Sequence, residues 1–277
     1  MEGSWQREGG VSGPDRREQI QDDESGVTHE IVYRNSEFSE RSPVVVYLGL
    51  GTTALTSAGQ LYLDAYMEKI ERPIINIETP VRAFSSFEQQ TKSQLQILRQ
   101  YGVEQFDVVG SSSGAIAATH LAAHAQADVE DLVTISIPNT RVNIGDYALH
   151  MPAQFADGIR EFIAVTRRGE LGQVVGPRAS NLFNVRKIPE LIHTTKEIFA
   201  TSLNDVPAML AASTHWTDIA GTGDKITDYK DHLRVVRERN DLHNRSSTSY
   251  LVTDQGHAWV LYRAYLADII GSVLSKK

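Results

Sequence analysis

The chain has 277 residues, a formal net charge of −8 at pH 7, 41% hydrophobic residues and no cysteine. This length fits one large α/β domain or two small ones, and the hydrophobic content is sufficient for a buried core. The acidic balance, without a basic cluster that could follow a phosphate backbone, argues against a nucleic-acid partner, and the lack of cysteine excludes disulfides and cysteine-ligated metals.

The first part of the chain divides into a polar extension and a region of strands. Residues 1–27 are polar and interrupted by glycine and proline, which predicts a disordered or loosely attached extension. Residues 28–33 alternate like a half-exposed edge strand. Residues 43–48 and 73–77 are β-branched runs, typical of parallel strands that are buried on both faces.

Strands then alternate with helices. A helix is predicted over residues 87–101 with Gly102 as its stop, followed by a strand at 106–109, a helix from residue 115 and a strand at 132–137. This alternation predicts an α/β fold, with a mainly parallel sheet that helices cover on both faces.

The strand pattern stops between residues 139 and 213, where amphipathic helical stretches are separated by glycine and proline. Such a segment is too long for a simple connection, so we expect a helical cap on the sheet. The pattern returns with a strand at 214–220, a helix at 228–239, a strand at 248–253 and a closing helix at 260–274. The predicted core therefore comprises residues 28–138 and 214–277.

The strand at 106–109 leads into the sequence Gly-Ser-Ser-Ser-Gly at residues 110–114, and an alanine-rich helix follows. Of the three serines, only Ser112 has glycine at both second neighbours. A sharp strand-to-helix turn exposes a serine hydroxyl and directs helix N–H groups toward a developing oxyanion. We interpret Ser112 as a candidate nucleophile; the alternative is a loop that is merely rich in serine and glycine.

Three further segments complete a resemblance to the α/β-hydrolase superfamily, specifically to its capped single-domain members. Residues 110–114 resemble the nucleophile elbow, residues 221–226 the loop that supplies the acid, and residues 254–259 the loop that supplies the histidine, in the family's order. Residues 48–53 resemble the oxyanion loop, and the resemblance spans about residues 27–277.

The resemblance implies a catalytic triad of Ser112, His257 and Asp224. It implies that the backbone N–H groups of Leu50 and Ser113 bind the oxyanion. Four further residues beside these loops are expected to contact the substrate: Gly49, Gly51, Ser111 and Trp259. No metal or organic cofactor is expected.

Some assignments have alternatives. Asp218 is a rival for the acid, because residues 214–219 are unusually polar for a central parallel strand; Asp146 is a poorer candidate. Leu48 stands where many relatives have a histidine, but backbone donors do not depend on that side chain. Three other histidines are interpreted as helix-surface or loop residues without the spacing of metal ligands: His120, His124 and His243.

The sequence thus predicts a serine hydrolase that cleaves a carboxylic ester or a similar acyl bond of a small molecule. An acyltransferase, a peptidase or a carbon–carbon bond hydrolase on the same triad, or a non-catalytic ligand-binding protein of this fold, remain alternatives. Six large cap residues are candidates to line the substrate pocket, of which only some are expected to reach it: Tyr147, Met151, Phe155, Phe162, Phe183 and Phe199. No run of ~20 apolar residues and no apolar signal core is present, so a cytoplasmic protein without a membrane partner is expected. The oligomeric state is left open.

Overall fold

The computed structural model describes residues 16–35, 40–49, 63, 70–80, 83–138, 203–224, 228–243, 247–253 and 264–274. The described residues form one eight-stranded sheet with the strand order β1-β2-β4-β3-β5-β6-β7-β8. The strand bounds are β1 (Arg16–Gln21), β2 (Thr28–Arg34), β3 (Val44–Tyr47), β4 (Ile74–Glu78), β5 (Phe106–Ser111), β6 (Val129–Ile135), β7 (His215–Gly221) and β8 (Thr248–Val252). The β1–β2 and β2–β4 pairs are antiparallel and the remaining pairs are parallel, which confirms the predicted fold class.

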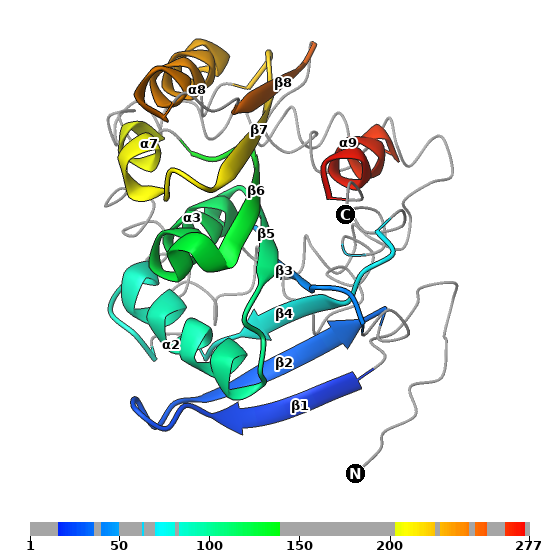
Figure 1. The fold of residues 1–277 in the computed structure, drawn as a ribbon, viewed down its shortest axis with the longest axis vertical. Helices are drawn as coiled ribbons and strands as arrows, with labels where there is room; N and C mark the ends of the chain where they lie inside the picture. Colours follow the sequence, from blue (N-terminus) through cyan, green and yellow to red (C-terminus); the bar gives the residue numbers. More distant parts are fainter. Residues whose placement is uncertain are drawn as a thin grey trace, which may run out of the picture.

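Helices cover both faces of this sheet (Figure 1). One face carries α2 (Phe87–Gln100), α3 (Ser113–Ala125), α7 (Val206–Met209) and α8 (Tyr229–His243), and the other carries α9 (Ala264–Leu274). Two short 3₁₀ helices are η2 (Gln126–Asp128) and η4 (Leu203–Asp205). Within the described ranges, no helix has the length and apolar character needed to cross a membrane.

Alternate residues of the central strands enter two separate hydrophobic cores. On β5, Val108 packs in the core beneath α2 and α3, whereas Val109 packs in the core beneath α9. All six residues of β5 are buried. A strand between two helical layers favours apolar side chains on both of its faces, and this explains the continuous β-branched runs that identified the strands in the sequence.

The amino-terminal extension predicted over residues 1–27 is wrong for residues 16–27, because Arg16–Gln21 form β1 and pair with β2 in antiparallel register. The Asp22 carboxylate closes the turn between the two strands by accepting the N–H groups of Glu24 (3.2 Å) and Ser25 (3.3 Å). β1 is mostly exposed and polar, so its sequence lacks the hydrophobic alternation that marks a strand. β2 is accordingly an interior strand and not the predicted edge strand.

Two other predictions meet the structure only in part. β6 begins and ends earlier than predicted: it starts at Val129 and stops at Ile135, and the next residue, Ser136, has a positive φ (50°) that interrupts the extended backbone. The end of the predicted cap is helical, in η4 and α7. Residues 1–15 and 139–202, which include the rest of the predicted extension and cap, lie outside the described residues.

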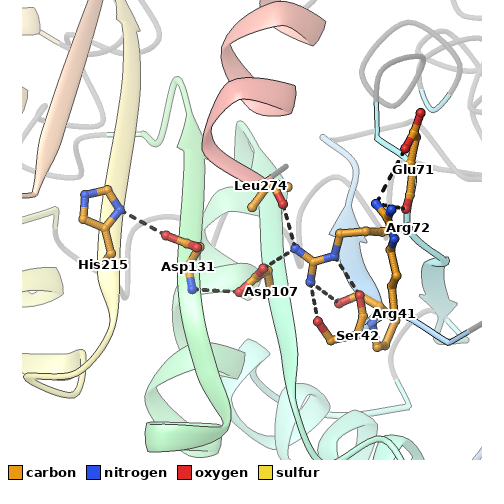
Figure 2. Close-up of polar contacts among 9 residues, drawn as sticks. Arg41, Ser42, Glu71, Arg72, Asp107, Asp131, His215 and Leu274 are labelled. Atoms are coloured by element: carbon orange, nitrogen blue, oxygen red, sulfur yellow. Dashed lines mark hydrogen bonds and ion pairs between the residues drawn. The ribbon is translucent and has the colours of Figure 1, made fainter. Parts of the chain in front are cut away.

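An ion pair is buried near the amino ends of the parallel strands (Figure 2). The Arg72 guanidinium donates to the Asp107 carboxylate at 2.5 Å, and the two side chains are 3% and 1% exposed. Arg72 also donates to the carbonyl of Leu274, at the C-terminal end of α9 (3.1 Å), and to the carbonyl of Ser42 (2.7 Å). One cation therefore joins β5, α9 and the segment before β3, and a positive charge at the end of α9 is favourable to the helix dipole.

Removing one partner of the Arg72–Asp107 pair is expected to destabilise the fold. Arg72→Met should lower the free energy of unfolding by about 3–5 kcal/mol, because the Asp107 carboxylate would stay buried without its cation. Arg99→Met is the matched control, since the Arg99–Asp128 pair is largely solvent-exposed and should be worth at most about 1 kcal/mol. Urea denaturation followed by circular dichroism measures both; equal losses would contradict the assigned role.

Candidate active site

Ser112 lies alone between β5 and α3, with φ 53° and ψ −127°. Residues other than glycine rarely adopt this backbone conformation, and such strain persists only where the surroundings enforce it. Here the Ser112 N–H donates to the carbonyl of Ile135 on β6 (2.8 Å), and the Ser112 carbonyl accepts the N–H of Ala115 (2.9 Å). The sheet and the helix thus hold the turn from both sides.

The glycines on either side of Ser112 are required by space. A Cβ on Gly110 would lie 2.5 Å from the Cβ of Ala118, and a Cβ on Gly114 would lie 2.5 Å from the carbonyl oxygen of Leu48. Because neither residue has a Cβ atom, the first turn of α3 can pack directly on the ends of β3 and β5.

The chain leaving β3 passes beside the candidate nucleophile. A Cβ on Gly49 would lie 3.2 Å from the Cβ of Ser112 and 3.3 Å from the carbonyl oxygen of Ser111. The start of the predicted oxyanion loop and Ser112 are therefore neighbours. Ser111 ends β5 and Ser113 begins α3, both buried. Leu50 and Gly51 lie outside the described residues.

Asp224 lies at the same edge of the sheet as Ser112. β5, β6 and β7 are parallel, and Ser111 is in register with Ile135, which is in register with Ile219. Both candidate residues follow the carboxyl ends of their strands, with β6 between them. Asp224 is buried, and its backbone N–H donates to the carbonyl of Gly221 (3.1 Å).

The rival acid Asp218 lies in the middle of β7 and is fully buried. One of its carboxylate oxygens accepts the hydroxyl of Thr134 (2.8 Å), and the other is 2.6 Å from Nδ1 of His232. The Trp216 indole N–H donates to the same Thr134 hydroxyl (2.9 Å). The polar composition of this strand thus serves a hydrogen-bond network inside the layer between β6, β7 and α8.

His232 is a candidate that the sequence analysis did not single out. It lies in the first turns of α8 and is 0% exposed. Burial alone would lower the pKa of this imidazole, but the adjacent Asp218 carboxylate, with further contributions from Asp224 and Asp231, holds the pKa above its ordinary value. In the sequence, His232 is visible only as a histidine near the start of a helix that follows the predicted acid loop. That position does not by itself indicate a buried ion pair.

The other histidines considered in the sequence analysis differ in burial, and one of them is not described by the structure. His120 and His124 lie one turn apart on α3, with ring centroids 6.4 Å apart, and partial burial lowers the pKa of both. His243 ends α8 at the surface. His257 and Trp259 lie outside the described residues, as do the six cap residues predicted to line the pocket. The last described position before His257 is Thr253, which follows β8 beside the end of β7.

Solved structures of other proteins share this arrangement of strands and helices. No protein-family model and no curated protein matches the sequence. A hydrolase from Pseudomonas aeruginosa PA01 has a similar structure, with a TM-score of 0.66 and 17% identity over 94% of this chain and 97% of that one. MGS-M2, an α/β hydrolase from a Medee basin deep-sea metagenome library, gives a TM-score of 0.63 and 14% identity over 90% of this chain and 95% of that one.

The chain has the α/β-hydrolase fold. A carboxylesterase structure from the thaumarchaeon Nitrososphaera gargenis agrees, with a TM-score of 0.62 and 13% identity over 93% of this chain and 98% of that one. In the α/β-hydrolase fold, a nucleophile stands on a strained strand-to-helix turn at the carboxyl edge of the sheet. Ser112 occupies such a turn.

The close approach of α3 to the strand ends predicts a steric cost at Gly114. Gly114→Ala should lower the free energy of unfolding by at least about 1–3 kcal/mol, because the added methyl group meets backbone carbonyls that cannot rotate away. Gly102→Asn is the control: Gly102 has φ +73° with nothing near its Cβ position, and asparagine tolerates this backbone. Denaturation midpoints measure both variants, and a Gly114→Ala protein as stable as Gly102→Asn would refute the steric account.

Proposed function

We propose that the chain is a serine hydrolase that cleaves a carboxylic ester or a similar acyl bond of a small molecule. The observation that carries the proposal is the conformation of Ser112, which is held at a positive φ between a sheet and a helix N-terminus. Other residues of the chain, such as Gln126, also have a positive φ, but among the described residues only Ser112 has it on a strand-to-helix turn flanked by two glycines, which is typical of the nucleophile in this fold. The carboxylesterase among the structural neighbours supports the same reaction class.

In the proposed mechanism, the Ser112 hydroxyl attacks the acyl carbon while His257 accepts the hydroxyl proton and then delivers it to the leaving alcohol. Asp224 orients the imidazole of His257 and stabilises its charged form. Water then attacks the acyl-enzyme, with His257 again as base, and releases the acid and free Ser112. Every step uses water and protein groups only.

The oxyanion is proposed to bind the backbone N–H groups of Ser113 and Leu50. Ser113 is the first residue of α3, where helix N–H groups have no partner within the helix. Each such donor is worth about 3 kcal/mol in the transition state. Gly49, whose small size leaves room beside Ser112, is proposed to contact the substrate, and the remaining proposed contacts are Gly51, Ser111 and Trp259.

The nucleophile assignment is tested by covalent labelling. Ser112→Ala should abolish labelling of the protein by a fluorophosphonate probe and leave the melting temperature nearly unchanged, because alanine fits the same turn. Ser272→Ala, at an exposed position on α9, should label like the wild type. Gel fluorescence quantifies the adduct, and persistent labelling of Ser112→Ala would exclude Ser112 as the nucleophile.

The choice between the two acids is tested by kinetics. Asp224→Asn should lower kcat/KM for a p-nitrophenyl ester by about 10³–10⁴, since the imidazole would lose the carboxylate that fixes its tautomer. Asp218→Asn should lower kcat/KM far less at pH 8, because Asp218 lies within the layer beneath the edge. The reverse order of effects would transfer the role of the acid to Asp218.

A further inference from the structure

A buried chain of hydrogen bonds joins the turn between β1 and β2 to the helix α2. The Ser93 hydroxyl of α2 donates to the Asp22 carboxylate in the turn (2.5 Å), and its oxygen lies 2.9 Å from Nε2 of His29 on β2. The Nδ1 atom of the same imidazole lies 3.0 Å from the hydroxyl of Thr79, which directly follows β4. Asp22 and His29 are 1% and 0% exposed, so these bonds are made away from water.

Asp22 fixes the direction of the donors. An ionised carboxylate can only accept, and the Ser93 hydroxyl has a single proton, which it gives to Asp22. The Ser93 oxygen therefore accepts the Nε2–H of His29. A neutral imidazole with its proton on Nε2 has a lone pair on Nδ1, which accepts the hydroxyl proton of Thr79. Both ring nitrogens of the neutral histidine are thus satisfied.

The other end of the chain agrees with this direction. The amide nitrogen of Gln94 donates to the carbonyl of Ile77 (3.0 Å) and to the Thr79 oxygen (2.8 Å), and the amide oxygen accepts the Tyr47 hydroxyl (2.6 Å). Because a carbonyl cannot donate, the amide cannot be reversed. The Thr79 oxygen accepts from Gln94, and its own proton is available for His29.

A protonated His29 does not fit this chain. Its Nδ1–H would point at the Thr79 oxygen, and the Thr79 proton would need another acceptor. Both ring nitrogens face hydroxyl groups, so no carboxylate among the described residues contacts the ring to compensate a buried positive charge. In agreement, burial lowers the pKa of His29, and the Asp22 carboxylate beyond Ser93 opposes this effect only in part.

We propose that His29 is a pH-sensitive switch: as a neutral imidazole it holds residues 22–27 against α2 and thereby keeps β1 in the sheet, and on protonation it releases both. The ring lies between Ser93 and Thr79, so an imidazolium that turns toward water opens the layer and breaks the Ser93–Asp22 hydrogen bond. β1 is the outer strand and is mostly exposed (Figure 1). It can therefore separate from β2 while the parallel strands remain paired.

The contacts that would remain are weaker. Ile20 packs partly against the core. Three polar contacts between the hairpin and the end of α2 lie at the surface: Gln96 with Glu24, Gln100 with Asp23, and Tyr101 with Glu18. Solvent-exposed polar contacts contribute little to stability, so the buried chain is the strongest polar attachment of the hairpin among the described residues.

The neighbours of the His29 ring on the adjoining strands and segments are uncharged. Its register partner on β1 is Ile20, the residue beside it after β4 is Thr79, and before α2 the ring stacks on Phe84 with the centroids 6.0 Å apart.

The nearby charged groups other than Asp22 have partners of their own. Glu30, the next residue on β2, pairs with Arg17 of β1, and Glu88 pairs with Lys92 on the exposed face of α2. Asp23 and Glu24 of the turn accept from α2 side chains. Asp22 is the charged group that acts on His29.

The effect of pH follows from the open state, in which His29 has its ordinary pKa of 6.5. Below about this pH, the open state binds a proton that the closed state excludes, so acid favours opening by up to about tenfold per pH unit. Asp22 responds at lower pH. Burial alone would raise its pKa, but hydrogen bonds from Ser25, Ser93 and two backbone N–H groups hold the pKa below the ordinary value of 3.8.

The test is hydrogen–deuterium exchange followed by mass spectrometry at pH 7.5 and 5.5. In the wild type, the protection factors of residues 16–27, which are corrected for the chemical exchange rate, should fall about tenfold on acidification, while those of β5 and β6 stay constant. His29→Gln keeps a donor for Ser93 and an acceptor for Thr79 but cannot ionise in this range, so its hairpin should be equally protected at both pH values.

The matched control is His215→Gln, at the start of β7, where the histidine contacts Asp131 (3.1 Å) and not the hairpin. Its residues 16–27 should respond to pH like those of the wild type. Wild-type protection that does not change with pH would overturn the proposal, as would an equal fall in His29→Gln or in β5 and β6.

If His29→Gln fails to fold, NMR of the ¹⁵N-histidine-labelled wild type decides. His29 should have its proton on Nε2 at pH 7.5 and should ionise in step with the loss of protection. A proton on Nδ1, or a charged ring at pH 7.5, would overturn the proposal.

Discussion

The contact between the first turn of α3 and the ends of β3 and β5 sets the geometry of the whole carboxyl edge. Gly110 and Gly114 bring helix and strand backbones together where no side chain fits, and Ala118 continues the contact along the helix. Ser112 cannot relax from its positive φ without separating α3 from the sheet. The position of the hydroxyl, the orientation of the helix N-terminus and the path of the chain after β3 all follow from this one approach.

The two edges of the parallel sheet have different physical characters. At the amino edge, the charges of Arg72 and Asp107 satisfy one another and nearby backbone groups. At the carboxyl edge, Ser112 and Ser136 have left-handed backbones, and the buried hydroxyl of Ser136 has no hydrogen-bond partner among the described residues. Positive φ angles also occur near the amino edge, at Asn35 and Gln126, so the buried ion pair, and not backbone strain, distinguishes the two edges.

Most of the fold could be predicted from the sequence because buried parallel strands require apolar residues on both faces, and such runs are visible without a structure. β1 could not, since it is an exposed polar strand that is stabilised by pairing with β2. The end of β6 was misplaced because Ile137 continues the apolar run beyond the turn at Ser136.

The candidate site was partly readable for a related reason. Gly110 and Gly114 are required by close contacts within the same segment, so the turn at Ser112 could be located from the sequence alone. The parallel strands place Asp224 at the same edge of the sheet. The Asp218–His232 pair depends on the packing of α8 against β7, a tertiary contact that no local pattern reports. The catalytic roles of Ser112 and Asp224 stay predictions, as do those of His257, Leu50 and Trp259, which lie outside the described residues.

The hydrogen bond from the Ser112 N–H to Ile135 gives the turn a non-local origin. A peptide with the sequence of β5 and α3 lacks the acceptor, which belongs to β6 and reaches its place only when the two strands are in register. The conformation of Ser112 therefore depends on the assembly of the sheet as well as on the glycines of its own segment.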